Sequence, residues 1–294
     1  PGLAAPVNDG GCGFDYRLAM GIPDCWFKLV DEVPDENWNM GYLWHELTNH
    51  RRDERTISYA ECPDQAIVGG KTIIFSLIDK EMYSFMRVTD ENLLIDRGMA
   101  LHKMIRLLTL ASASDGYLNF MGNEFGHPEW IDFPRVGNNW SYQYARRQWR
   151  LRDDPELKYH FLADFDREMV RLILRENVIG TTQPLMLWLR EGDKVIAFER
   201  GGLYFFFNFH PSQSFSDYPI DVPPGEYVRV MDTDERRFGG QDRIARDQHF
   251  LALPRQVGVE IKHAIRVYLP ARTGMILRPC PKKRKTAGSL KKSA

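Results

Sequence analysis

Residues 56–65 read TISYAECPDQ, a short apolar run that leads into acidic and amide side chains. A second such stretch, YLNFMGNEFGHPEW, occupies residues 117–130. Short apolar runs of this kind are typical of buried strands. Between them, segments 72–85 and 98–113 carry apolar residues near helical spacing. Strands that alternate with helices predict an α/β fold with a parallel sheet and helical crossovers.

The rest of the chain extends this pattern and then departs from it. A short strand or a turn is expected at 14–20, and helices are expected at 23–30, 39–48, 146–151 and 155–176. After Gly180 the composition changes to β-branched and aromatic runs, punctuated by glycine and proline, at 195–199, 203–208, 227–232 and 265–269. Such runs predict an antiparallel, all-β region after the α/β region.

Composition and charge narrow the functional classes. The 294 residues are 43% hydrophobic and 27% charged, which is typical of a soluble globular protein. The net charge of −1 offers no overall field to attract nucleic acid. No apolar run approaches the roughly twenty residues of a membrane span. The four cysteines show no CxxC pairing and no secretory leader is visible, so we expect free thiols in a cytoplasmic protein.

Several blocks of sequence resemble one enzyme family, the 1,4-α-glucan branching enzymes of the α-amylase superfamily, in their eukaryotic glycogen-branching form. The blocks are GFDYRLAM (13–20), WNMG (38–41), DQAIVG (64–69), IDRGMALHKMIR (95–106), GNEFGHPEW (122–130), DFPR (132–135), GNN (137–139) and FNFHP (207–211). The resemblance covers about residues 1–278. It implies the C-terminal part of a (β/α)₈ barrel over 1–177, a C-terminal antiparallel β-sandwich over 178–278 and a basic disordered tail over 279–294.

The resemblance also implies a function and site residues. Branching enzymes cleave an α-1,4-glucan and transfer the segment to a 6-hydroxyl, which makes the α-1,6 branches of glycogen. Active residues of such barrels lie at the carboxyl ends of the strands. Asp64 would hold sugar hydroxyls and stabilise the transition state. The residues expected to bind substrate are Glu61, Gln65, Asp15, Tyr16, Asn123 and Glu124.

No cofactor or metal is expected at this site. His45 and His50 flank Glu46, but they are five residues apart rather than four, which departs from the zinc-protease spacing. The expected partner is α-glucan, with no nucleic acid and no membrane. Near the carboxyl end, Lys282, Lys283, Arg284 and Lys285 resemble a nuclear-import patch, although a solvated terminus is the favoured interpretation.

The branching reaction of the family needs two catalytic carboxylates besides Asp64. Retaining transfer uses a nucleophile and an acid/base about 5–5.5 Å apart. By the resemblance, the nucleophilic Asp and the acid/base Glu both precede residue 1, so we expect this chain to be inactive alone. The family pattern Glu-Ser-His-Asp-Gln is also altered, because Pro63 replaces the histidine that would donate a hydrogen bond to the sugar.

These departures leave alternatives open. The chain could be a non-catalytic protein that binds glucan or another chain, or a truncated product without a stable fold. Three of eight strands cannot close a barrel, so a full-length branching enzyme or another chain could cover the open half. Outside the family context, Asp64 is a turn residue, and Glu61 and Gln65 cap the end of a strand.

Overall fold

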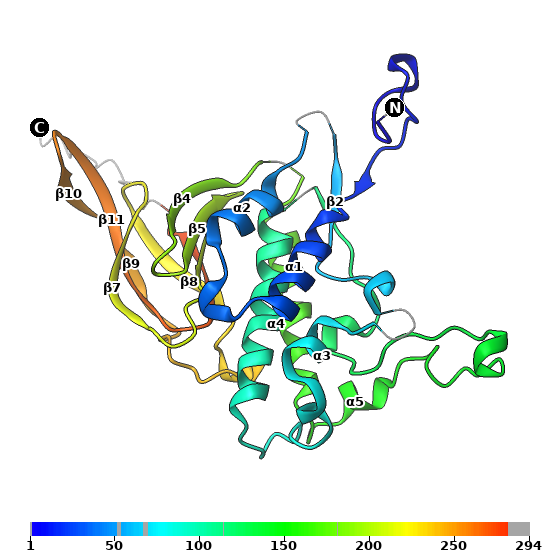
Figure 1. Ribbon diagram of the computed structural model, residues 1–294. Helices are drawn as coiled ribbons and strands as arrows, with labels where there is room; N and C mark the ends of the chain where they lie inside the picture. The colour runs from blue at the N-terminus through cyan, green and yellow to red at the C-terminus, as the bar shows by residue number, and fades with distance from the viewer. Residues whose placement is uncertain (1, 52–53, 67–69, 114, 181, 282–294) are drawn as a thin grey trace, which may run out of the picture.

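The amino-terminal half is built around a small parallel sheet. The computed structural model describes residues 2–51, 54–66, 70–113, 115–180 and 182–281. Its strands are β1 (Arg17–Leu18), β2 (Thr56–Ser58) and β3 (Gly116–Tyr117), which pair in parallel in the order β1-β2-β3. Helices follow each of these strands, so the predicted α/β arrangement is confirmed, although the strands are shorter than expected (Figure 1).

The helices are amphipathic or buried segments near the predicted places. They are α1 (Gly21–Glu32), α2 (Met40–Thr48), α3 (Ile73–Ile78), α4 (Leu93–Ser112), α5 (Trp149–Asp153) and α6 (Tyr159–Arg175). The described residues also form seven 3₁₀ turns: η1 (Val7–Asp9), η2 (Asp35–Asn37), η3 (Pro63–Ala66), η4 (Asp79–Tyr83), η5 (Asn123–Phe125), η6 (Val136–Asn138) and η7 (Arg236–Phe238).

Helix α4 forms the centre of the molecule. The Asn92 side chain caps it by accepting hydrogen bonds from two backbone amides at its start, 2.9 and 3.2 Å away. Gly98 allows α3 to approach closely, because a Cβ atom there would lie 2.2 Å from a side-chain carbon of Ile78. The single helix expected over 72–85 is instead divided into α3 and η4. Asp79 adopts φ of 56° at the junction, which ends the regular helix.

The second half is an antiparallel β-sandwich, as predicted. One sheet has the order β4-β5-β6-β12-β8-β9 and the other β10-β11-β7. The strands are β4 (Leu185–Arg190), β5 (Val195–Arg200), β6 (Leu203–Asn208), β7 (Phe215–Asp221), β8 (Glu226–Asp232), β9 (His249–Leu251), β10 (Leu253–Val257), β11 (Glu260–Leu269) and β12 (Thr273–Pro279).

The six-stranded sheet separates two hydrophobic cores. In β6, Phe205 and Phe207 point into the core shared with the helices, whereas Tyr204 and Phe206 point into the core between the two sheets. Both faces of this strand are therefore covered, and all six of its residues are buried. The larger core is continuous from the helices into the sandwich, so the two halves pack as one body.

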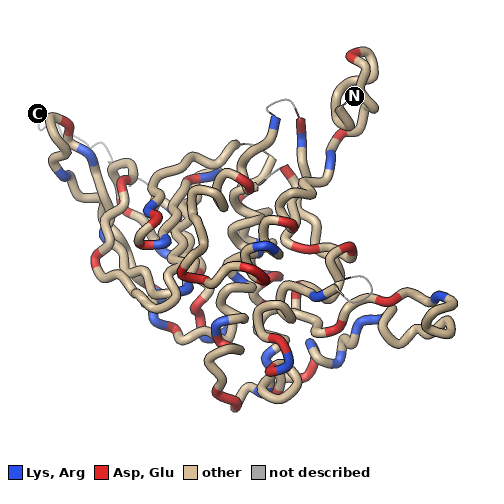
Figure 2. The backbone as a smooth tube through the Cα atoms, in the orientation of Figure 1, with Lys and Arg blue, Asp and Glu red and all other residues tan. Residues whose placement is uncertain are grey.

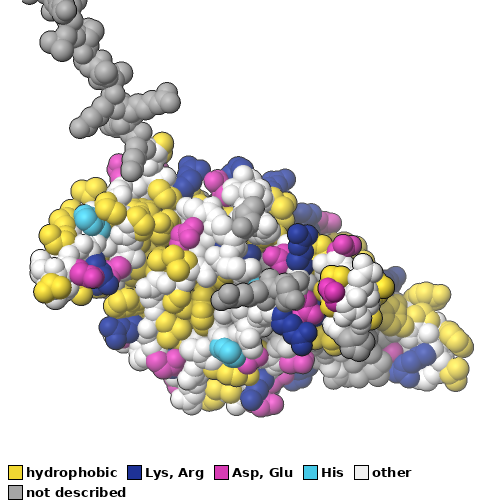
Figure 3. All heavy atoms as spheres, turned by 90° about the horizontal axis from the view of Figure 1, so that it is seen from above, with side chains coloured by type: hydrophobic (Ala, Val, Ile, Leu, Met, Phe, Trp, Pro, Cys, Tyr) yellow, Lys and Arg dark blue, Asp and Glu magenta, His cyan; other side chains and the backbone are white. Residues whose placement is uncertain are grey.

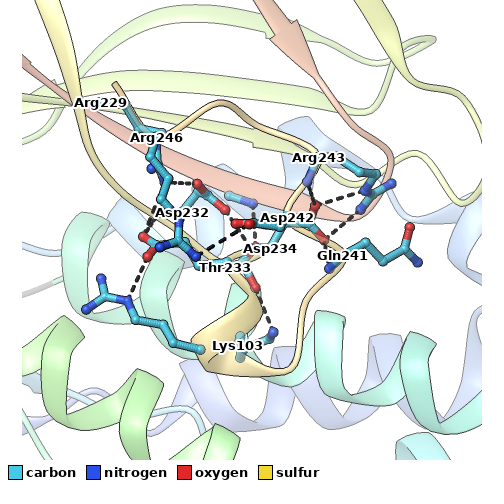
Figure 4. Close-up of polar contacts among 12 residues, drawn as sticks. Lys103, Arg229, Asp232, Thr233, Asp234, Gln241, Asp242, Arg243 and Arg246 are labelled. Atoms are coloured by element: carbon cyan, nitrogen blue, oxygen red, sulfur yellow. Dashed lines mark hydrogen bonds and ion pairs between the residues drawn. The ribbon is translucent and has the colours of Figure 1, made fainter. Parts of the chain in front are cut away.

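A buried lysine joins α4 to the sandwich (Figure 4). Lys103 is 2% exposed, and its ammonium donates to the carbonyl oxygens of Thr233 at 2.6 Å and Phe238 at 2.7 Å. Burial lowers the pKa of Lys103 to about 8, against the attraction of Asp234 and Asp232. The junction is thus held by a cation whose hydrogen bonds cross from helix to loop.

Three further features concern predictions made from the sequence: the surface charge, the possibility of a membrane span, and the carboxyl end. Basic and acidic residues are interspersed along the described backbone (Figure 2). Among the described residues, no helix has both the length and the apolar character needed to cross a membrane.

Pro279 belongs to β12, and the backbone amide of Cys280 donates to the carbonyl oxygen of Glu226 at 2.7 Å. The basic residues Lys282, Lys283, Arg284 and Lys285 lie outside the described residues.

Candidate functional site: the carboxyl edge of the parallel sheet

The segments that follow β2 and β3 meet at the carboxyl edge of the parallel sheet. The amide of Ile131 donates to the carbonyl oxygen of Ala66 at 2.8 Å, and the Thr72 hydroxyl donates to the carbonyl oxygen of His127 at 3.4 Å. These bonds join η3 and its neighbourhood to the loop after η5. Because parallel strands share one carboxyl edge, predicted site residues from both segments gather here.

Asp64 is presented to solvent by the turn η3. Pro63 takes the first position of this 3₁₀ turn, where a missing N–H is tolerated, and Asp64 follows it with an exposed side chain. The side-chain oxygen of Gln65 accepts from the amide of Cys62 at 2.9 Å, which closes the turn. Gln65 therefore shapes the backbone that displays Asp64.

Glu61 lies only three residues before Asp64, but its surroundings differ completely. It is 3% exposed, and its Oε2 accepts from the amide of Ile73 at the start of α3, 2.8 Å away. Its other oxygen is buried with no hydrogen-bond partner in the described part of the chain. Burial raises the pKa of Glu61 to about 7, and the positive charges of Arg106 and Arg147 only partly oppose this.

Asn123 and Glu124 occupy the turn η5 after β3. Asn123 is 1% exposed, and its side-chain nitrogen has no partner among the described residues. Glu124 Oε2 accepts from the amide of Gly122 at 2.6 Å. Burial also raises the pKa of Glu124 above its usual range. The Glu124 side chain therefore helps to hold the turn, and neither residue is as exposed as Asp64.

Arg147 organises this edge, although no sequence pattern pointed to it. Its guanidinium donates to the carbonyl oxygens of Met121 at 2.8 Å and Glu129 at 3.2 Å, and contacts Asn123 Oδ1 at 3.5 Å. It also lies 3.2 Å from Nδ1 of His127. Burial and the nearby Arg147 lower the pKa of His127 to about 4, so this imidazole is neutral near pH 7.

A second network lies beneath the turn. Arg106 in α4 donates to Asp166 Oδ1 at 2.6 Å and to Asn119 Oδ1 at 2.7 Å, and Asn119 donates to Asp166 Oδ2 at 3.0 Å. Both members of the ion pair are buried. The pair fixes the segment after β3 against α4 and α6, which positions η5.

Asp15 and Tyr16 lie elsewhere. They precede β1, whose Arg17 pairs with Thr56 at the beginning of β2, so they belong to the amino edge of the sheet. Both are exposed, and the guanidinium of Arg55 lies 5.9 Å from the centre of the Tyr16 ring. The structure thus brings five of the seven predicted site residues to one edge and places these two at the opposite one.

The group of side chains with metal-ligand geometry lies away from this edge. In the described part of the chain, one group of three side chains has metal-ligand geometry, namely Glu226, His249 and Cys280. It belongs to the sandwich. The carboxyl edge instead offers an exposed carboxylate, Asp64, which can accept hydrogen bonds from the hydroxyl groups of a ligand.

Comparisons with known proteins identify relatives of this chain. Residues 188–280 match the family model of the alpha amylase C-terminal all-beta domain. A 1,4-alpha-glucan-branching enzyme of Felis catus is 52% identical over 284 residues, covering 94% of this chain and 40% of that relative. One of Dictyostelium discoideum is 50% identical, covering 94% and 41%. The chain is a homologue of the 1,4-alpha-glucan-branching enzymes.

This branching-enzyme homologue spans about two fifths of the length of the curated relatives it matches. Among solved structures, an α-amylase from H. orenii aligns with 94% of this chain and 51% of its own length, at 12% identity and a TM-score of 0.49. The identities to the branching enzymes of Felis catus and Dictyostelium discoideum confirm the resemblance seen in the sequence blocks.

Proposed function

We propose that this branching-enzyme homologue supplies the last three strands of the catalytic barrel, over residues 1–177, and the C-terminal sandwich, over 178–278, of a glucan-branching activity. The observation that carries the proposal is the exposed Asp64 at the carboxyl edge of the parallel sheet. Catalytic groups of (β/α)₈ enzymes occupy this edge. The substrate is an α-glucan, and the reaction moves an α-1,4-linked segment to a 6-hydroxyl.

In this proposal Asp64 accepts hydrogen bonds from sugar hydroxyls. A carboxylate beside the anomeric carbon stabilises the oxocarbenium-like transition state more than the ground state, which is what accelerates the reaction. Gln65, Asn123 and Glu124 form the surrounding wall. Glu61 supports the site by capping α3, and the proposed site does not include Asp15 and Tyr16.

For the chain by itself we expect glucan binding without turnover. Retaining transfer needs a nucleophile and an acid/base in addition to the stabilising carboxylate. Glu61 is buried and bound to the amide of Ile73, and Glu124 is bound to the amide of Gly122. Neither carboxyl is presented beside Asp64 as an exposed, ionised group.

The edge strand β1 of the parallel sheet indicates where a partner chain would bind. Leu18 and Met20, in and after the edge strand β1, are 46% and 63% exposed, and Phe14 is 60% exposed. Figure 3 shows hydrophobic side chains mixed with charged ones over the face turned toward the viewer. We propose that the remainder of a barrel, from a full-length branching enzyme or another chain, covers β1. The four free cysteines fit a reducing, cytoplasmic location for this activity.

The test combines catalysis with binding. The purified 294-residue chain is incubated with amylose, and both the iodine complex and the reducing ends are followed. Branching lowers the iodine colour without new reducing ends, whereas hydrolysis creates them. We expect neither change, together with retardation of the chain in glycogen-containing native gels.

Two variants test whether the retardation by glycogen depends on Asp64. Asp64→Asn should abolish most of the retardation by glycogen. Asp153→Asn, a charge-matched change at an exposed residue of α5, should leave the retardation unchanged. Branching by the chain alone would show that other carboxyls here serve as nucleophile and acid. Equal retardation of the two variants would remove Asp64 from the site.

A specific observation favours a second function, a non-catalytic glucan-binding protein. Pro63 stands where the family has a histidine donor and cannot replace it. Mixing the chain with a full-length branching enzyme distinguishes the two functions. Association that leaves the rate unchanged, with glycogen retention intact, supports the binding role.

A further inference from the structure

Three side chains with metal-binding atoms converge on one face of the six-stranded sheet. The β8–β9 pairing places His249 opposite Val228, which lies two residues from Glu226 and so on the same face. On the other side of β8, Pro279 pairs with Tyr227, and Cys280 follows opposite Glu226. The 2.7 Å bond from the amide of Cys280 to the carbonyl oxygen of Glu226 confirms this register.

The ligand atoms approach a common point. Nδ1 of His249 lies 2.9 Å from Oε1 of Glu226 and 3.9 Å from Sγ of Cys280. One atom from each of the three side chains lies within 4.8 Å of the others. Ligands of a tetrahedral zinc ion are roughly 3.4–3.6 Å apart, from bond lengths of about 2.0–2.3 Å. Glu226 and His249 are each 52% exposed, so small side-chain rotations suffice to reach that spacing.

We propose that Glu226, His249 and Cys280 bind a divalent transition-metal ion of the zinc class. A thiolate, an imidazole and a carboxylate are zinc ligands, whereas calcium and magnesium prefer oxygen ligands alone. An ordinary Glu–His ion pair accounts for the 2.9 Å contact, but not for a thiol directed at the same nitrogen. Three protein ligands leave the fourth tetrahedral position open to solvent.

Such an ion would join three separate parts of the chain. Glu226 begins β8, His249 begins the edge strand β9, and Cys280 follows the last residue of β12. The ion would therefore fix the edge of the sheet and the point where the chain leaves it. Because a thiol loses its proton when it binds metal, the affinity should rise with pH. The site is independent of the proposed glucan function.

The test is a titration of the reduced full chain with Co²⁺, a spectroscopic substitute for Zn²⁺. We expect one Co²⁺ per chain, with a thiolate-to-cobalt absorption band in the near ultraviolet that added Zn²⁺ removes. Cys280→Ser should abolish the band. His249→Gln should weaken binding at least ~10-fold, since even the loss of a group behind a ligand costs that much.

Matched controls use an exposed cysteine and an exposed histidine elsewhere. Cys12→Ser and His45→Gln should retain both the band and the affinity. Melting curves provide a second measurement, in which Zn²⁺ raises the midpoint of the wild type but not of Cys280→Ser. The proposal is overturned if the wild type shows no band, if the band survives Cys280→Ser, or if Zn²⁺ shifts both midpoints equally.

Discussion

Replacing Glu61 with glutamine should remove a pH-dependent loss of stability. The carboxyl is fully buried, and its pKa is raised from 4.5 to about 7. Below pH 4.5 it is protonated in both the folded and the unfolded chain, so the full stability is present. As the pH rises to 7 and beyond, the unfolded chain releases this proton more readily, and the folded state loses stability.

The magnitude follows from the size of this change in pKa. At 1.36 kcal/mol for each pH unit, it corresponds to a loss of about 3 kcal/mol between pH 4.5 and pH 8. Glu61→Gln keeps an oxygen acceptor for the amide of Ile73 but carries no charge at any pH. The free energy of unfolding of the wild type, relative to this variant, should therefore fall by about 3 kcal/mol over that range.

Urea denaturation at pH 5, 6, 7 and 8 measures the difference directly. Asp153→Asn, which removes an exposed carboxylate, controls for the change in net charge. A difference between wild type and Glu61→Gln that stays constant with pH would refute the assignment to burial. A wild type that gains stability with pH relative to the variant would mean that Arg106 and Arg147 outweigh burial and keep the carboxylate ionised.

Three further changes test the junction and the site. Lys103→Met leaves the carbonyl oxygens of Thr233 and Phe238 unpaired and should lower the free energy of unfolding by about 2–4 kcal/mol, measured by urea denaturation. Asp64→Asn should weaken glycogen binding by about 10–100-fold in affinity gels, because charge-assisted bonds to hydroxyls are lost. Pro63→His restores a donor and should strengthen glycogen binding about 3–10-fold in the same gels, with an unchanged melting curve. Weaker binding by the histidine variant would contradict the assigned direction of that donor.

The sequence predicted the fold where burial is local and missed it where burial depends on distant partners. β6 is recognisable because its first five residues are apolar or aromatic, and the structure covers both of its faces. β7 was not predicted, since it contains Pro219 and half-exposed residues, and only pairing with β11 makes it a strand. The break at Asp79 was missed because a non-glycine residue there adopts a left-handed conformation.

The candidate site also has features that the sequence predicted and features that it missed. The resemblance to the branching enzymes placed the expected site at the carboxyl ends of the strands, and parallel pairing brings the ends of β2 and β3 together. The exposure of each carboxyl was not predictable from the sequence. Asp64 is exposed, whereas Glu61, three residues earlier, is buried. Arg147 could not be identified, because it reaches the edge from a loop whose path the local sequence does not determine.

Pro63 distinguishes what the fold requires from what the chemistry requires. At the first position of η3 a proline costs the backbone little, since no hydrogen bond from its nitrogen is needed there. The turn therefore forms and presents Asp64 with or without the family's histidine. A substitution that leaves the turn intact but removes a donor to the sugar acts on binding alone. Intact architecture at this edge is consequently weak evidence for catalysis, and measurements on Pro63 and Asp64 together carry more weight than the fold.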